Sequence, residues 1–227
     1  MFFASDNTSG VPDAILGALG RANAGFSMGY GADDLMVTVR DRLRALFEAP
    51  EAAVYLVATG TAANSLAIAT QVQPWSRVWC HKHAHIEEDE CNAPEFYAGG
   101  MKLSLLDGDD AKIDAEGLAQ ALAEAPGGVH HAQPGLLSLT NLTERGARYT
   151  VAEITRLAGL AKAHGLPVHL DGARFANALV AEGCTPAEMT WKAGVDVLSF
   201  GGTKNGLLGV EAVVLFDPAL AGNRAIR

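Results

Sequence analysis

The chain has 227 residues, a formal net charge of −9, 49% hydrophobic residues and 19% charged residues. This length allows a sizeable buried core, the composition is that of a globular protein, and the acidic balance argues against nucleic acid or an anionic membrane as the main partner. No segment approaches a membrane span, and the first ten residues do not resemble a signal peptide. Three scattered cysteines favour free thiols in a reducing cytoplasm.

Apolar periodicity predicts an alternation of helices and strands. In chain order the predicted elements are helices 12–24 and 33–48, strand 52–58, helix 61–72, strands 77–81 and 101–107, helix 114–124, strand 135–141, helix 151–164, and strands 166–171, 196–200 and 211–216. The strands are apolar throughout, which is typical of parallel strands covered on both faces. The sequence therefore predicts an α/β protein with three layers, in which helices cover both faces of a mainly parallel sheet.

Three of these strands lead to residues that could hold one ligand, because ligands bind such sheets beyond the carboxyl ends of the strands. One strand leads into Gly60 and Thr61 at a helix start, where backbone N–H groups and a hydroxyl can bind phosphate. Another ends in Asp171, which could cap a helix or pair with a protonated pyridine nitrogen. A third leads to Lys204, whose flanking glycines we expect to leave room for a cofactor bound as a Schiff base. Together, in this order, they indicate a pyridoxal phosphate site.

Six segments carry a more specific signal: FASDN, YGADD, GTAANSLA, AHIEEDECNAPEF, HLDGARFANA and WKAGVDVLSFGGTKNG. They are distributed along nearly the whole chain, and their order resembles that of the low-specificity threonine aldolases, within the beta-eliminating lyase and aspartate-aminotransferase-like fold group. The resemblance implies an aspartate-aminotransferase-like large domain that binds pyridoxal 5′-phosphate. It also implies aldol cleavage of L-threonine, L-allo-threonine and related β-hydroxy-α-amino acids to glycine and an aldehyde.

The resemblance implies roles for the residues that would touch the cofactor. Lys204 would form the Schiff base, Asp171 would pair with the pyridine nitrogen, and Gly60 and Thr61 would bind the phosphate. His85 would stack on the ring and help position or deprotonate the substrate hydroxyl.

Further roles implied by the resemblance concern the substrate and the subunit interface. Arg174 would lie by the phenolic oxygen of the cofactor and the substrate carboxylate, and Ser5 would contact that carboxylate. His130 matches a histidine near the substrate hydroxyl. Tyr30 and Gly31 match a loop at the subunit interface, where active sites are shared, and Tyr30 is expected to contact the substrate.

The same resemblance sets expectations for organisation. Residues 1–30 are expected to form an N-terminal segment that contributes to the active site and interface, and residues 31–227 the pyridoxal-phosphate-binding large domain. The smaller C-terminal domain of the family is expected to be absent, which leaves the activity of this chain open. We expect a cytoplasmic homodimer or homotetramer that acts on a small amino acid.

Other functions remain open at this point. Another lyase or an aminotransferase of the same fold type would keep the lysine and the acid, and a shortened protein could bind the cofactor without turnover. A metal-binding protein is a further alternative, because one short stretch holds the possible ligands His81, His83, His85, Glu87, Glu90 and Cys91. We expect no metal there, because a helix beginning near Ala84 would separate the three imidazole rings.

Overall fold

The computed structural model describes residues 4–8, 10–125 and 127–221. Within these residues a seven-stranded sheet forms, in the order β1-β7-β6-β5-β4-β2-β3. The strands are β1 (Ala53–Val57), β2 (Ser76–His81), β3 (Lys102–Leu106), β4 (Gln133–Thr140), β5 (Val168–Gly172), β6 (Val197–Gly201) and β7 (Glu211–Leu215). Only β7 runs antiparallel to its neighbours, β1 and β6. The mainly parallel sheet predicted from the sequence is confirmed.

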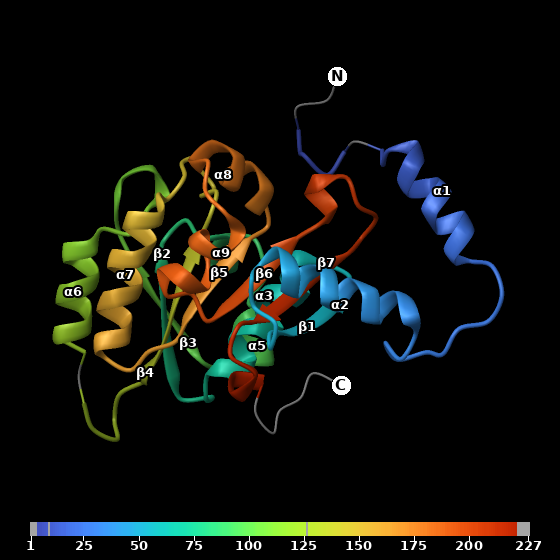
Figure 1. Ribbon diagram of the computed structural model, residues 1–227. Coiled ribbons are helices and arrows are strands. Elements are labelled where there is room, and N and C mark those ends of the chain that lie inside the picture. Colours follow the sequence, from blue (N-terminus) through green and yellow to red (C-terminus); the bar gives the residue numbers. More distant parts are fainter. Residues whose placement is uncertain (1–3, 9, 126, 222–227) are drawn as a thin grey trace.

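Helices lie on both faces of this sheet (Figure 1). The α-helices are α1 (Asp13–Ala22), α2 (Asp34–Leu46), α3 (Gly60–Gln71), α4 (His85–Glu88), α5 (Ala93–Tyr97), α6 (Ala115–Ala123), α7 (Val151–Ala163), α8 (Phe175–Glu182) and α9 (Pro186–Met189). Short 3₁₀ turns are η1 (Asp109–Ala111), η2 (Trp191–Ala193), η3 (Thr203–Asn205) and η4 (Pro218–Ala221). Apolar residues of α3 and α4 pack against one face, with α5 beside α3, and those of α6 to α9 pack against the other face. The predicted three-layer α/β architecture is therefore confirmed.

Strand β5 shows how the sequence divides the two faces. All five of its residues are buried, and alternate side chains point to opposite sides. Val168 and Leu170 belong to the large apolar core under α7. His169 and Asp171 point to the other face, where Asp171 contacts a residue of α3. Burial of β5 on both sides therefore places an acidic group between the sheet and α3.

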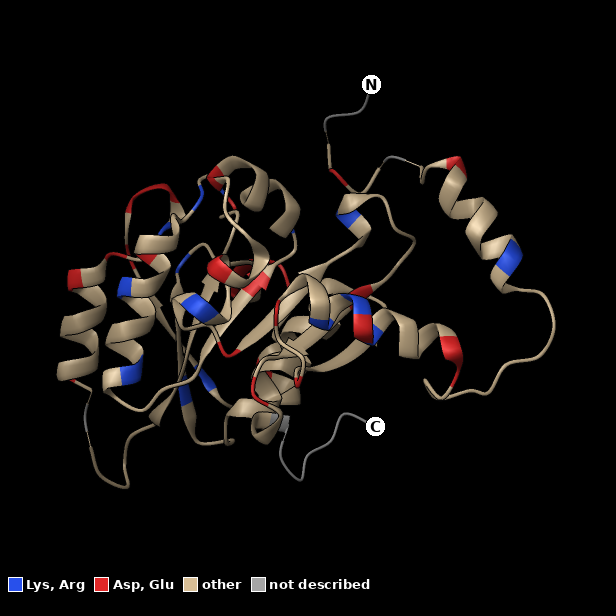
Figure 2. Cartoon of the chain, in the orientation of Figure 1, with Lys and Arg blue, Asp and Glu red and all other residues tan. Residues whose placement is uncertain are grey.

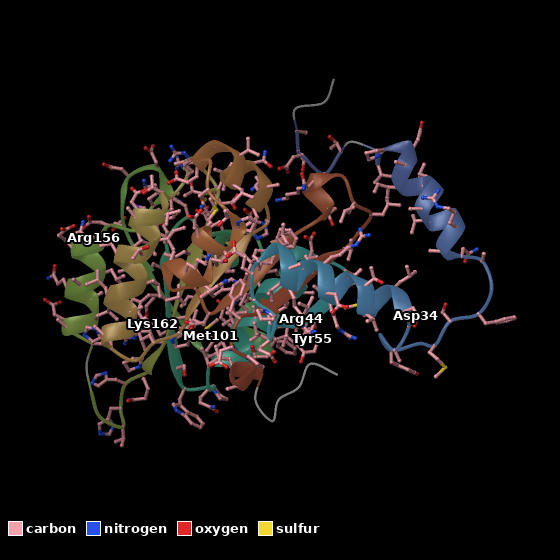
Figure 3. All side chains as sticks on the ribbon, in the orientation of Figure 1. Asp34, Arg44, Tyr55, Met101, Arg156 and Lys162 are labelled. Atoms are coloured by element: carbon pink, nitrogen blue, oxygen red, sulfur yellow. The ribbon has the colours of Figure 1, made fainter. Side chains whose placement is uncertain are left out.

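Helix α7 has well-defined ends and an ion pair with its neighbour α6. Thr150 and Glu153 form a capping box at its start, and Gly165, with φ of +72°, follows its end. The side chain of Arg156, labelled in Figure 3, pairs with Glu116 of α6 at 2.5 Å. The helix covers the sheet face opposite to α3, where its buried residues Ile154, Leu157, Ala158 and Ala161 join the apolar core.

Four phenylalanines tie the element ends around β6 together: Phe47, Phe175, Phe200 and Phe216. Their ring centroids lie 5.4 Å to 5.8 Å apart in the four contacts, with tilted or edge-on geometry that favours aromatic pairs. Phe175 begins α8 and is 1% exposed. Its burial fixes the position of the preceding Arg174.

The segment before α2 stands apart from this body. Figure 1 shows α1 away from the sheet, joined to α2 by a long connection, and none of its residues is buried. Helix α2 lies against β1, where Arg44 donates to the carbonyl of Ala52 and lies near Tyr55 (Figure 3). Among the described residues, no helix combines the length and the apolar character needed to cross a membrane.

Candidate active site

A cavity of about 490 Å³ opens at the carboxyl edge of the sheet. Five of the residues predicted for the cofactor site line it: Gly60, Thr61, His85, Asp171 and Lys204. They converge because β1, β5 and β6 point the same way, so that the segments following them meet at one edge.

The start of α3 forms one wall of this cavity. Thr59 caps the helix by accepting a hydrogen bond from the N–H of Ala62 at 3.1 Å. A Cβ atom placed on Gly60 would meet nothing within 4 Å, so the backbone here faces open space. Free N–H groups at a helix start attract anions. This wall is therefore suited to a phosphate group.

Thr203 adds a hydroxyl to the same cavity. Its Oγ1 is buried and has no hydrogen-bond partner in the described part of the chain. A buried hydroxyl without a partner is energetically unfavourable, and an anionic oxygen in the cavity would satisfy it. The sequence prediction did not include this residue, although it directly precedes Lys204.

Asp171 lies on the penultimate position of β5 and is 3% exposed. Its Oδ2 accepts a hydrogen bond from the side chain of Asn64 at 2.9 Å, and its Oδ1 accepts one from the N–H of Ala173 at 3.0 Å. These two hydrogen bonds fix the orientation of the carboxylate. The residue can therefore present a fixed negative charge to a cationic ring.

Lys204 lies on the short 3₁₀ turn after β6, with its side chain 17% exposed. Its Nζ is 4.0 Å from Oδ1 of Asp6. Gly201 and Gly202, which precede the lysine, were expected to leave room for the cofactor, but the structure gives another reason for them. A Cβ atom on Gly201 would lie 2.3 Å from the carbonyl oxygen of Ala173, and one on Gly202 would lie 2.4 Å from that of Val210. These glycines permit close backbone packing under the lysine, rather than leaving room for a ring and phosphate.

Arg174 lies beside the cavity and is engaged by two acids. Its Nε donates to Oδ2 of Asp6 at 2.6 Å, and its Nη1 is 3.9 Å from Glu144. Burial of Asp6 opposes ionisation, but the ion pair with Arg174 outweighs it and holds the pKa of Asp6 below its usual value. Asp6 thus connects the N-terminal segment with both Arg174 and Lys204.

His85 begins α4 and donates from Nδ1 to Oε1 of Glu90 at 2.8 Å. This hydrogen bond raises the pKa of His85 above its ordinary value, although burial acts in the opposite direction. The side chain of Glu90 is completely buried, and burial raises its pKa. Asn64 donates to the same Oε1 at 2.7 Å. Glu90 and Asn64 are therefore part of the site, and the sequence prediction assigned them no role there.

Three predicted site residues lie away from the cavity. Ser5 is exposed, and its hydroxyl accepts from the N–H of Asn7, which itself lines the cavity. Tyr30 is fully exposed in the connection between α1 and α2. His130 is exposed just before β4, at the amino edge of the sheet, because a residue preceding a parallel strand lies at the edge opposite to the strand ends. The structure therefore does not bring these three residues to the cavity.

The three alternating histidines have separate partners. His81 Nε2 forms a hydrogen bond with the carbonyl oxygen of Gly108 at 3.1 Å, whereas Nδ1 of His83 lies 2.7 Å from Oε1 of Glu88. The chain becomes helical at His85, as expected, and directs that ring into the cavity. In the described residues, no group of three or more histidine, cysteine or acidic side chains is arranged to hold a metal ion.

A family model described as beta-eliminating lyase matches residues 3–226. The chain belongs to the beta-eliminating lyase family. The low specificity L-threonine aldolases of Pseudomonas sp. and Pseudomonas aeruginosa are 41% and 42% identical to it over 219 residues, or 96% of this chain and 63% of each relative. The solved structure of Leishmania major threonine aldolase has a TM-score of 0.90 and 31% identity, over 97% of this chain and 64% of that one. The chain thus spans less than two thirds of the length of these relatives.

Beta-eliminating lyases of this fold are pyridoxal phosphate enzymes, and pyridoxal phosphate is accordingly the cofactor of this chain. The cavity fits such a group in its donor chemistry. The unpartnered Thr203 hydroxyl and the start of α3 suit the phosphate, and Asp171 suits the pyridinium nitrogen. Lys204 supplies the amine. The cavity thus brings together a helix start, a hydroxyl, a carboxylate and an amine whose chemistry fits the phosphate, the ring nitrogen and the aldehyde of this cofactor.

Proposed function

We propose that this chain is an aldehyde-lyase that cleaves L-threonine, L-allo-threonine and related β-hydroxy-α-amino acids to glycine and an aldehyde. The observation that carries the proposal is the presence of Lys204 and Asp171 in one cavity with the open start of α3. The 41% identity to a low specificity L-threonine aldolase over 96% of the chain supports the choice of reaction.

In this proposal Lys204 holds the cofactor through its amine, while Gly60, Thr61 and Thr203 hold the phosphate. When bound, pyridoxal phosphate supplies an electron sink for the pair released from the Cα–Cβ bond. Asp171, which two N–H donors hold in place, would pair with the ring nitrogen.

The remaining groups act on the substrate. His85 carries its proton on Nδ1, toward Glu90, so its Nε2 is available to accept the proton of the β-hydroxyl, directly or through water. Arg174 is the cation beside the cavity that suits the substrate carboxylate, with Asp6 as its partner in the absence of substrate. His130 has no part in this mechanism because it lies at the opposite edge of the sheet.

The proposal is tested by adding pyridoxal phosphate to the purified chain and assaying products. A visible absorbance band is expected, with glycine and an aldehyde formed from threonine and from phenylserine. Pyruvate formed from alanine would instead indicate transamination, and colour without product would reduce the proposal to cofactor binding.

The variant Lys204→Ala is expected to lose the band and to reduce aldehyde release by about a thousandfold or more, because no other amine in the described part of the chain lines the cavity. Lys192→Ala is the matched control, since Lys192 is an exposed lysine paired with Glu48 outside the cavity. Retention of full activity in Lys204→Ala would refute the assignment.

We also propose a cytoplasmic homodimer or homotetramer, in which residues 1–30 contribute to the interface and residues 31–227 form the cofactor-binding domain. Large apolar side chains on and after α1 support this proposal, because they are unprotected in a single chain: Leu16, Leu19, Phe26, Met28 and Tyr30. The net charge of −9, with acidic and basic residues interspersed on several elements (Figure 2), supports a partner other than nucleic acid. Three free thiols support the cytoplasm.

A further inference from the structure

Four side chains from different parts of the chain form one continuous hydrogen-bond chain beneath the cavity. His85 donates to Glu90 at 2.8 Å, Asn64 donates to Glu90 at 2.7 Å, and Asn64 also donates to Asp171 at 2.9 Å. The contact between Asn64 and Asp171 joins α3 to β5 across 107 residues of sequence. The predicted ring-stacking histidine and the predicted pyridine partner are thus linked through two residues that lie between them.

The orientation of Asn64 follows from its partners. Its amide nitrogen has two hydrogens, and each is taken by one carboxylate. The opposite orientation would direct Oδ1 at two carboxylate oxygens, which is electrostatically unfavourable. Asn64 is 2% exposed, so water cannot easily replace either bond. The amide therefore fixes the spacing of the two acids.

Glu90 is an unusual residue to bury. Its side chain is completely buried, its Oε2 has no hydrogen-bond partner in the described residues, and its ion-pair partner there is His85. A buried carboxylate without a lysine or arginine is destabilising unless its hydrogen bonds compensate. The burial has a functional explanation if the carboxylate fixes the orientation and the tautomer of the His85 imidazole.

We propose that Glu90 and Asn64 are positioning residues for the cofactor site. Glu90 holds the imidazole of His85 with its proton on Nδ1 and Nε2 directed to the cavity. Asn64 holds Glu90 and Asp171 at a fixed separation and keeps the carboxylate of Asp171 oriented for the ring nitrogen. The inference rests on the proposed function, in which His85 and Asp171 contact the cofactor.

A second histidine provides a matched control within the same segment. His83 and Glu88 have the same five-residue separation and a contact of 2.7 Å, but both are partly exposed and lie outside the cavity. Glu88→Gln therefore removes the same negative charge from a histidine hydrogen bond as Glu90→Gln. Only the buried pair is expected to affect His85.

The first experiment uses the ligand-free chain with isotope-labelled histidine, so it does not depend on cofactor or turnover. Nuclear magnetic resonance follows the titration and tautomer of His85 in wild type, Glu90→Gln and Glu88→Gln. Apart from Glu90, the charged groups that face His85 or share its cavity are Asp171, Glu144, Asp89, Lys204 and Glu211, and both variants retain all of them. In Glu90→Gln the His85 titration is expected to move to lower pH and the Nδ1–H tautomer to lose its preference. Glu88→Gln is expected to match wild type at His85.

The second experiment measures pyridoxal phosphate binding by absorbance titration of the full chain. Asn64→Ala is expected to raise the dissociation constant about tenfold or more, because Asp171 loses a charge-assisted donor. Thermal unfolding of each variant verifies that it is folded.

Either of two results overturns the inference. One is a His85 titration in folded Glu90→Gln that coincides with wild type. The other is an unchanged dissociation constant in folded Asn64→Ala, which also decides the matter if Glu90→Gln does not fold. A wild-type chain that binds no pyridoxal phosphate, but shows the expected His85 shift, would refute the proposed function and leave the coupling of Glu90 to His85 intact.

Discussion

At the scale of single residues, His169 is a completely buried titratable group. Its Nδ1 contacts the hydroxyl of Ser138 on β4 at 2.9 Å, and its Nε2 contacts that of Ser199 on β6 at 3.0 Å. Complete burial lowers the pKa of His169 to about 4, while the nearby charge of Asp171 acts in the opposite direction. A neutral imidazole thus joins three adjacent strands directly beneath the candidate active site.

This burial predicts a pH dependence of stability. The unfolded chain binds a proton on His169 below about pH 6.5, but the folded chain does so only near pH 4, so stability falls as pH decreases through this window. The resulting loss in the free energy of unfolding reaches about 3 kcal/mol at the low-pH end of this window. It is measured by urea unfolding at a series of pH values in wild type and His169→Asn.

The exposed His164 provides the control for this measurement. His164→Asn is expected to retain the wild-type slope, and His169→Asn to lose the component between pH 6.5 and 4. Equal slopes for all three proteins would show that His169 is protonated as readily in the folded state as in the unfolded state.

At the scale of elements, the decisive feature is the junction of β6 with the turn that carries Lys204. Gly201 approaches the backbone of Ala173, and the N–H of Gly202 donates to the buried carboxylate of Glu211 at 2.6 Å. The lysine is therefore placed by backbone packing and one buried acid. The backbone thus sets the position of the lysine Cα, and the side chain only has to extend from there into the cavity.

This junction gives a prediction for Gly201, with Gly159 of α7 as the control. Gly201→Ala would place a Cβ 2.3 Å from a carbonyl oxygen, so it is expected to destabilise the chain by about 2 kcal/mol or more and to weaken cofactor binding. Gly159→Ala, inside α7 with no atom within 4 Å, is expected to stabilise by about 0.5–1 kcal/mol. Denaturant unfolding and absorbance titration measure both effects. Similar stabilities for the two variants would contradict the packing argument.

The sequence predicted those features that depend on local pattern. The predicted bounds of each strand agree with the observed ones to within two residues, because apolar runs bounded by turn residues are a local sequence signal. Gly60, Asp171 and Lys204 could be assigned together because each follows or ends such a run. The short helices α5, α8 and α9 were not assigned, since they are held by packing rather than by a helical repeat of their own.

The contacts that complete the site could not be read in the same way. Asn64 meets Glu90 and Asp171 only after α3 is laid on the sheet, and no local pattern records that pairing. Its place one helical turn after Gly60 was the available signal, because it puts both on the same side of α3. His130 lies beside a second histidine in the sequence, and its distance from the cavity depends on the direction of β4.

At the scale of the whole molecule, apolar surface is concentrated at the N-terminal end of the described chain. Leu16 and Leu19 on α1 are about half exposed, and Phe26 and Met28 after it are 108% and 74% exposed. A ten-residue helix without buried contacts is marginally stable in water. A second copy that covers this surface would explain why it is apolar.

The expected outcome is a particle larger than one chain in light scattering after size-exclusion chromatography. Leu16→Asp combined with Leu19→Asp is expected to shift the mass toward that of a single chain, because charges resist burial in an interface. Leu105→Asp, at an exposed leucine on β3 at the far edge of the sheet, is the control and should keep the larger mass. A wild-type protein with the mass of one chain would contradict the proposed assembly.

The reversed direction of β7 has one more consequence. Since β7 returns beside β6, the segment bearing the amine is a hairpin closed by the pair Gly201 and Glu211, whereas a crossover would have led through a helix. A hairpin whose two ends belong to paired strands has little conformational freedom. The segment that carries the Lys204 amine is thus fixed at both ends by paired strands. The length of this hairpin therefore limits how far the amine can extend over the edge of the sheet.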